Sequence, residues 1–128
     1  MKTQIVQRKD IDKESWDEFV TSNRDGYVYH LYDMICIDRY VEDEDISFAI
    51  WDDDKKEIVC ICMLHMEEKP NGETLLHSRY GNVIKDGLSP KEEKKLCKAY
   101  MEYIDQLFVK TNAMKLAAGT PPLAENGY

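Results

Sequence analysis

The sequence predicts an α/β protein with a mixed, mainly antiparallel sheet that is flanked by helices. Segments rich in β-branched and aromatic residues follow one another between positions 46 and 79, separated by short turns. The middle segment, residues 58–66, is almost wholly apolar, which is typical of a central strand covered on both faces. Amphipathic helical patterns before and after these segments supply the helices for that cover.

Composition favours one soluble domain over residues 1–128. The chain is 43% hydrophobic and 33% charged, and a domain of this size buries enough surface to fold without disulfides. Its net charge of -8 argues against duplex nucleic acid as the main partner, because phosphate binding needs clustered Lys and Arg. No window resembles a membrane span or a signal peptide, so we expect a cytoplasmic protein without membrane association. Four cysteines lie in apolar segments, and we expect them to be reduced: Cys36, Cys60, Cys62 and Cys97.

The N-terminal part predicts one strand and two helices. Residues 4–9 are compatible with a short strand, and Asp12 or Ser15 can cap the helix that follows. That helix carries three apolar residues on one face and ends at residues 23–26: Trp16, Phe19 and Val20. We expect residues 27–30 to be extended and residues 31–40 to form the second helix.

The central part predicts a meander of three antiparallel strands. The strands are expected at residues 46–51, 57–67 and 73–79, with turns at 52–56 and 69–72. The second turn contains Asn71-Gly72, a typical hairpin signal. Acidic runs at 42–45 and 52–54 fall at predicted turns and indicate solvated loops.

The C-terminal part predicts a long helix and a last strand. Ser89, Pro90 and Glu92 combine a capping hydroxyl, a proline in the first turn and a carboxylate three residues after the cap, which is a capping box. Apolar residues then recur at helical spacing to about residue 110. Residues 114–118 read as a strand that Pro121 and Pro122 terminate.

This order of elements resembles the first half of the GNAT acyltransferase fold. Residues 16–20 (WDEFV), a glycine-containing turn and Tyr29-His30 are similar to the opening of the GNAT-like half-domains in Fem-type peptidoglycan bridge aminoacyltransferases. Residues 80–84 (YGNVI) and 86–90 (DGLSP) resemble the Tyr-Gly-Gly-Pro-Leu segment before the long helix in that family. The resemblance implies a half-domain that supplies the substrate side of an active site.

The same resemblance implies candidate substrate-binding residues. In the family, the loop after the meander faces the substrate cleft, which points to Arg79, Tyr80 and Asn82 as groups offered to a peptide or nucleotide-linked substrate. Arg79 is suited to pair with a carboxylate or phosphate, and His30 is suited to act as a general base. The alternative is that Arg79 and His30 are ordinary surface residues and that Tyr80 packs against the sheet.

Cofactor and metal sites are not expected. Family members that use acyl-CoA hold its pyrophosphate on a Gly-rich turn that opens a helix in the second half, and the glycines after Ser89 do not form such a turn. A zinc site would need ligands such as those of Cys60, Cys62 and His65. In a strand, however, side chains alternate between the two faces, which places the thiols and the imidazole on opposite faces. His77 can approach His65 from the next strand, although no neighbouring carboxylates are evident.

Two functions from different classes remain open, with a third behind them. The first is an acyl- or aminoacyltransferase-related subunit that is not active alone and completes its sheet with a second copy or a partner chain. The second is a non-catalytic, acidic protein-interaction module that keeps a degenerate GNAT-like fold. The third is a small-ligand binding module around Tyr80. We expect a homodimer or a partner chain, because the strand at 114–118 leaves an edge open.

Overall fold

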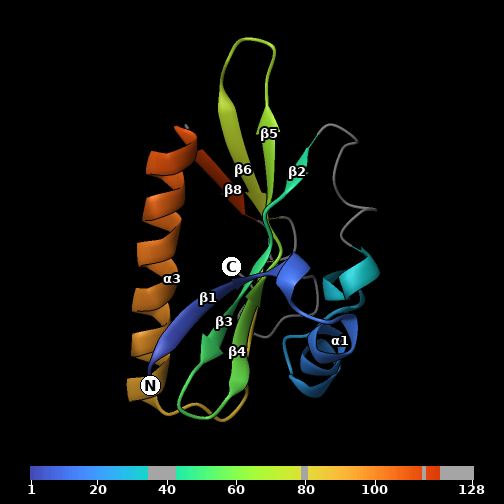
Figure 1. Cartoon of the computed structure of the whole chain (residues 1–128), viewed down its shortest axis with the longest axis vertical. Coiled ribbons are helices and arrows are strands. Elements are labelled where there is room, and N and C mark those ends of the chain that lie inside the picture. The colour runs from blue at the N-terminus through green and yellow to red at the C-terminus, as the bar shows by residue number, and fades with distance from the viewer. Residues whose placement is uncertain (35–42, 79–80, 114, 119–128) are drawn as a thin grey trace.

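Within the part of the chain that the structure describes, two four-stranded sheets and two α-helices form the fold (Figure 1). The computed structural model describes residues 1–34, 43–78, 81–113 and 115–118, the last four by their backbone alone. The long helix α3 runs along one side of the sheets, and α1 lies on the other side (Figure 1). The predicted fold class, a mainly antiparallel sheet flanked by helices, is confirmed.

The first sheet contains the strands that carry most of the core. Its order is β1-β3-β4-β7, and all its neighbours are antiparallel. A register shift at Ile50/Trp51 bends the β3–β4 pair. The strands are β1 (Thr3–Gln7), β3 (Phe48–Asp52), β4 (Glu57–Cys62) and β7 (Asn82–Ile84).

The strands of the second sheet are interleaved with those of the first along the chain. Residues 63–64 separate β4 of the first sheet from the next strand, which belongs to the second sheet. Its order is β2-β5-β6-β8, and the β6–β8 pair is parallel. The β5–β6 hairpin projects away from the first sheet (Figure 1). The strands are β2 (Glu44–Asp45), β5 (His65–Glu68), β6 (Thr74–Ser78) and β8 (Lys115–Ala118).

Both α-helices begin at side-chain caps. For α1 (Lys13–Ser22) the cap is Asp12, whose carboxylate accepts a hydrogen bond from Ser15 N at 2.9 Å. For α3 (Pro90–Thr111) the predicted capping box is present, and the helix ends at Asn112 with φ 54°. Three short 3₁₀ turns complete the described elements: η1 (Arg8–Asp10), η2 (Val28–His30) and η3 (Tyr32–Met34).

The central strand β4 is covered on both faces, as its apolar sequence predicts. Ile61 packs with the α1 residues of one core cluster, whereas Cys60 and Cys62 pack with α3 in the other. The α1 cluster includes Trp16, Phe19, Val20 and Val83. The α3 cluster includes Phe48, Ile50, Leu76, Leu96, Ile104 and Leu107.

Several predicted elements differ from the observed ones. The strand expected at 57–67 is divided between β4 and β5, because the chain passes from one sheet to the other at residues 63–64. The strand expected at 46–51 corresponds to β3, which begins two residues later, and the short strand β2 precedes the expected range. Residues 28–30 form a 3₁₀ turn rather than an extended segment. The helix expected at 31–40 begins as η3, and its remainder lies outside the described residues.

Candidate functional site

The predicted site residues fall in three different places. Arg79 and Tyr80 lie outside the described residues. Asn82 is half-buried at the start of β7, so it belongs to a strand and not to the loop that the sequence predicts. His30 is fully buried in η2. Asn82 lines a cleft between β7 and α3, whereas His30 does not line it, and the use of either residue with a substrate stays a prediction.

His30 holds the turn after α1 in place. Its ring Nδ1 accepts a hydrogen bond from Tyr27 N at 3.0 Å, and its carbonyl accepts one from Trp16 Nε1 at 2.8 Å. The Trp16 indole is fully buried in the α1 cluster. This arrangement is structural, and a fully buried ring does not support the role of general base.

A cleft lies between β7 and the N-terminal half of α3. Its volume is about 420 Å³, which is in the range of small-molecule sites. We call it the β7 cleft. Residues of the α1–η2 loop, β4, β7, the β7–α3 loop and α3 line it: Arg24, Asp25, Cys60, Asn82, Ile84, Lys85, Asp86, Gly87, Glu93, Leu96, Cys97 and Tyr100.

The loops at the mouth of the β7 cleft are tied to each other. Arg24 N donates to Asp86 Oδ2 at 2.7 Å, and Asp86 N donates to Asn23 Oδ1 at 2.8 Å. Gly87 has a φ of 81°, a conformation that favours glycine. These contacts fix the path of the chain from β7 into α3.

A buried polar cluster lies beside the cleft, next to the end of β6. Burial raises the pKa of Cys62 to about 12, and the neighbouring Ser78 and Tyr100 side chains partly oppose that shift. Burial also raises the pKa of Tyr100 to about 12, while its hydrogen bond with Asn82 lowers it. The thiol and the phenol are thus neutral near pH 7, and they can donate hydrogen bonds but do not act as bases.

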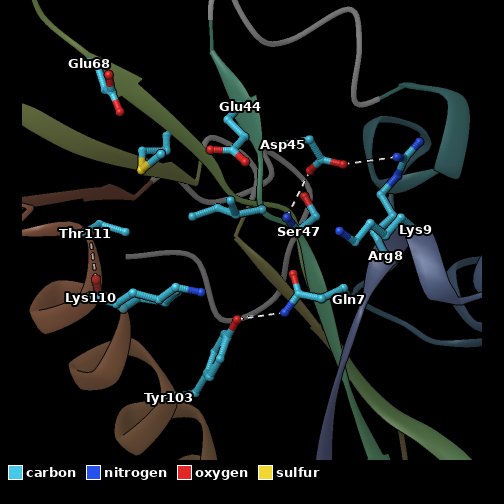
Figure 2. Close-up of a pocket in the computed structure, with 13 residues that line it drawn as sticks. Gln7, Arg8, Lys9, Glu44, Asp45, Ser47, Glu68, Tyr103, Lys110 and Thr111 are labelled. Carbon is cyan, nitrogen blue, oxygen red and sulfur yellow. Dashed lines mark hydrogen bonds and ion pairs between the residues drawn. The ribbon is translucent and has the colours of Figure 1, made fainter.

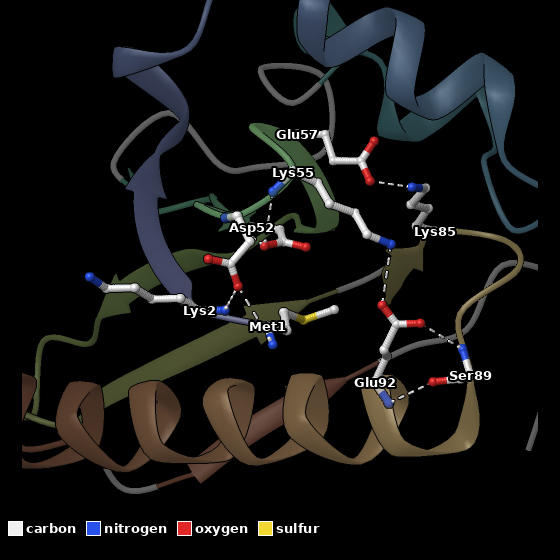
Figure 3. Close-up of polar contacts among 9 residues, drawn as sticks. Met1, Lys2, Asp52, Lys55, Glu57, Lys85, Ser89 and Glu92 are labelled. Atoms are coloured by element: carbon white, nitrogen blue, oxygen red, sulfur yellow. Dashed lines mark hydrogen bonds and ion pairs between the residues drawn. The ribbon is translucent and has the colours of Figure 1, made fainter.

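Two backbone amides at the N-terminus of α3 are bonded by side chains of its capping box (Figure 3). Ser89 Oγ accepts a hydrogen bond from Glu92 N at 3.2 Å, and Glu92 Oε1 accepts one from Ser89 N at 3.1 Å. The other carboxylate oxygen of Glu92 pairs with Lys55 Nζ at 3.4 Å. Hydrogen bonding to the Ser89 backbone is the main cause that lowers the pKa of Glu92, which keeps a negative charge at the helix start.

A second cavity, of about 540 Å³, lies under the C-terminal half of α3. Figure 2 shows Lys110 extending from α3 toward the strands, with Gln7 Nε2 bonded to Tyr103 Oη at 2.8 Å. Arg8 Nη1 pairs with Asp45 Oδ2 at 3.1 Å. Charges of both signs line this cavity and partly neutralise one another, so it favours no single class of ligand.

A pair of histidines lies on neighbouring strands, as the sequence predicts, but with carboxylates that the sequence does not predict. His65 and His77 are opposite residues of β5 and β6, and their rings stack with centroids 5.0 Å apart. Carboxylates do accompany them, because His65 Nε2 lies 3.2 Å from Asp43 Oδ2 and His77 Nε2 lies 2.9 Å from Glu67 Oε1. Sequence spacing could not reveal the contact with Asp43, because Asp43 directly precedes β2 and lies 22 positions before His65 in the chain. Within the described residues, no group of three or more potential ligands is arranged to hold a metal ion.

Comparison with known proteins finds similarity at the level of the fold. No protein-family model matches the sequence, and no curated protein does. Among solved structures, a ribosomal-protein-alanine N-acetyltransferase from Brucella melitensis biovar Abortus 2308 is similar with a TM-score of 0.66 and 12% identity. That match covers 98% of this chain and 84% of the Brucella chain.

Other acetyltransferases give the same result. A Trypanosoma brucei acetyltransferase matches with a TM-score of 0.61 and 10% identity, over 94% of this chain and 84% of its own. The aminoglycoside N-acetyltransferase AAC(6')-Iy, solved in complex with CoA, matches with a TM-score of 0.57 and 14% identity, over 94% of this chain and 78% of its own. The chain therefore has a GNAT-like fold.

Proposed function

We propose that this chain is an acyltransferase-related protein that supplies the substrate side of an acyl-transfer site and is not active alone. The GNAT-like fold supports the relation to acyltransferases. The β7 cleft supports a substrate-side role, because it offers a concave site with neutral hydrogen-bonding groups at Asn82 and Tyr100. The substrate classes that we propose are a peptide or a nucleotide-linked group.

The proposal that the chain is not active alone rests on the N-terminus of α3, where a capping box bonds two backbone amides. Acyl-CoA needs a place for its pyrophosphate, and free amides at a helix N-terminus are the usual one. Here side chains of the capping box accept the hydrogen bonds of Ser89 N and Glu92 N, Pro90 has no N–H to offer, and Glu92 and Glu93 add negative charge. The residues present do not fit a pyrophosphate, so the donor site has to come from elsewhere.

The partner would be a second copy or another chain. In the second sheet, β8 pairs with β6 and is the outer strand of the described residues. An outer strand can pair with a strand from another molecule. We propose that this edge is where the missing donor side attaches.

The alternative function is a non-catalytic, acidic interaction module that keeps the fold. The same capped helix N-terminus favours it, together with the net charge of -8. A stable monomer in solution supports this alternative, whereas a homodimer or a defined complex supports the first proposal.

Calorimetric titration with acetyl-CoA tests the absence of a donor site. We expect no measurable heat of binding from the isolated chain, because side chains already bond Ser89 N and Glu92 N and the nearby carboxylates repel an anion. Circular dichroism of the same sample, with a cooperative urea transition, controls for folding. A micromolar dissociation constant contradicts the proposal.

No helix within the described residues has the length and apolar character needed to cross a membrane.

A further inference from the structure

We infer that the outer edge of β7 binds an extended, positively charged peptide segment of another protein, which adds to the first sheet as a strand. This inference deepens the proposed function, because it concerns the same cleft, and it is argued from the backbone of β7, the walls of the cleft and their charge. It names an occupant for the β7 cleft whether or not the chain takes part in acyl transfer.

The first step is the backbone of β7. Lys85 N donates to Val59 O on β4 at 2.9 Å, and Ile84 stands opposite Cys60. Because ladder hydrogen bonds in an antiparallel pair involve alternate residues, Val83 and Lys85 face β4. Asn82 and Ile84 therefore direct their N–H and C=O groups to the other edge.

The second step is that this edge opens into the β7 cleft. β7 ends the strand order of its sheet, and within the described residues no backbone hydrogen bond is made by Asn82 or Ile84 at that edge. Both residues line the cleft. A row of backbone donors and acceptors in a concave site is what an added strand pairs with.

The third step is the chemistry of the walls. Leu96 and Ile84 supply apolar surface, while Tyr100 and the Asn82 side chain supply neutral polar groups. An extended peptide presents the same combination, with side chains on alternate faces and amides between them. The cleft contains no free cluster of cations for a phosphate or a carboxylate among its described residues.

The fourth step is charge. Of the cations at the cleft, Lys85 pairs with Glu57, and Arg24 Nε lies 3.5 Å from Asp25 Oδ1. Asp86 and the exposed Glu93 add further negative charge. A mouth with excess negative charge favours a basic peptide, and it disfavours a second copy of a chain whose net charge is -8.

Amide hydrogen exchange by NMR tests whether the edge is open. In the free protein we expect Val83 and Lys85 to be protected, and Asn82 and Ile84 to exchange freely. Protection of all four amides would show that the chain covers its own edge and would overturn the inference.

Titration with defined peptides tests the occupant. The probe is the blocked pentapeptide acetyl-Lys-Val-Thr-Val-Lys-amide, and we expect it to shift and protect the Asn82 and Ile84 amides. Two N-methylated versions, modified at alternate amides, should differ by about ten-fold in affinity, because one set of amides faces β7 and the other faces solvent. Equal binding of the two versions excludes strand addition and overturns the inference.

Charge reversal tests the basic character. Glu93→Lys should weaken binding of the lysine-flanked peptide about three-fold, in keeping with an exposed ion pair. Glu102→Lys is the matched control, because it makes the same change on the opposite side of α3 and should leave binding unchanged. Equal or tighter binding of the glutamate-flanked peptide by the unmodified chain contradicts the inference. Titration of these variants with acetyl-CoA tests the proposed absence of a donor site, and its result does not depend on whether the peptide binds.

Discussion

Ser89 is the residue whose contribution to stability is easiest to isolate. Its hydroxyl accepts the hydrogen bond of Glu92 N, and the residue is exposed, so its removal leaves no core cavity. We expect Ser89→Ala to lower the free energy of unfolding by about 1 kcal/mol. Urea unfolding followed by circular dichroism measures the change.

A serine at the other end of a helix provides the control for this prediction. Ser22 is exposed in the last turn of α1 and should tolerate alanine with little loss of stability. If Ser89→Ala and Ser22→Ala leave the same urea midpoint, the capping box does not stabilise α3.

Cys62 gives the chain a pH-dependent stability in the alkaline range. Its pKa is about 12 in the folded protein against an ordinary value of 9.0, because it is buried. The unfolded chain therefore loses this proton at lower pH than the folded chain, and stability falls as pH rises from 9.0 toward 12. Each proton of difference changes the free energy of unfolding by about 1.4 kcal/mol per pH unit.

We expect Cys62→Ala to flatten this alkaline decline while lowering stability at neutral pH through the lost packing. The decline should not vanish, because burial also raises the pKa of Cys60 and Tyr100. Urea midpoints measured in steps from pH 8 upward, with the ordinary thiol value of 9.0 as the reference, provide the test. Cys97→Ala changes an exposed thiol and should leave the slope unchanged. A slope that is equal in all three proteins would contradict the burial of Cys62.

At the scale of elements, a buried serine bridges the break between the two sheets. Ser47 Oγ accepts a hydrogen bond from Leu64 N at 2.8 Å and donates one to Leu64 O at 3.2 Å. The Ser47 carbonyl accepts a hydrogen bond from Arg8 N at 2.9 Å. This side chain thus replaces ladder hydrogen bonds at the point where both strand pairs leave one sheet for the other.

We expect Ser47→Ala to destabilise the protein by about 1–3 kcal/mol, because it leaves the Leu64 N–H without its hydrogen-bond acceptor. The Leu64 carbonyl keeps the hydrogen bond that it accepts from Ile46 N at 2.9 Å. Ser47 itself is 1% exposed, so water cannot replace its hydroxyl without rearrangement. Thermal or urea unfolding gives the value. Thr21→Ala is the control, since it removes an exposed hydroxyl within α1. Similar midpoints for the two variants would show that the hydroxyl does not hold the break.

The elements that the sequence predicts well are those specified by neighbouring residues. The capping box and apolar spacing of α3 are local, and so is the apolar run of β4 that required cover on both faces. The break at residues 63–64 depends on Ser47, which is 17 residues away from Leu64. No local pattern records such a contact, and the strand was therefore predicted as continuous.

The candidate site follows the same rule. Asn82 was selected from its place in a short motif, and it does line the β7 cleft. Local spacing places Tyr100 among the apolar residues of α3 and does not reveal that it lies beside Asn82 of β7. The carboxylates beside His65 and His77 were missed for the same reason.

At the scale of the whole molecule, the two sheets present edges of different character. The β7 edge opens into a cleft with acidic residues at its mouth. The β8 edge belongs to a strand whose sequence, KLAA, carries one charge, and that charge is positive. Self-association through β8 is thus free of the repulsion that a second acidic copy would meet at β7.

The last prediction is a dimer, or a complex with a second chain, that forms through the β8 edge. Light scattering over a range of concentrations should report a mass above that of the monomer, because an unprotected outer strand pairs readily with another strand. Successive residues of a strand direct their N–H groups to opposite edges, so Leu116 and Ala117 serve different partners. Each is opposite a residue of β6, namely Leu76 and His77.

Proline at each position separates the two edges. One of Leu116→Pro and Ala117→Pro removes a ladder bond to β6 and should lower the urea midpoint, whereas the other removes an outer donor and should dissociate the dimer with the fold retained. Light scattering and urea unfolding of both variants assign the two roles. A wild-type chain that stays monomeric at every concentration contradicts association through β8. If both variants unfold alike and neither dissociates selectively, the contact lies on a different surface.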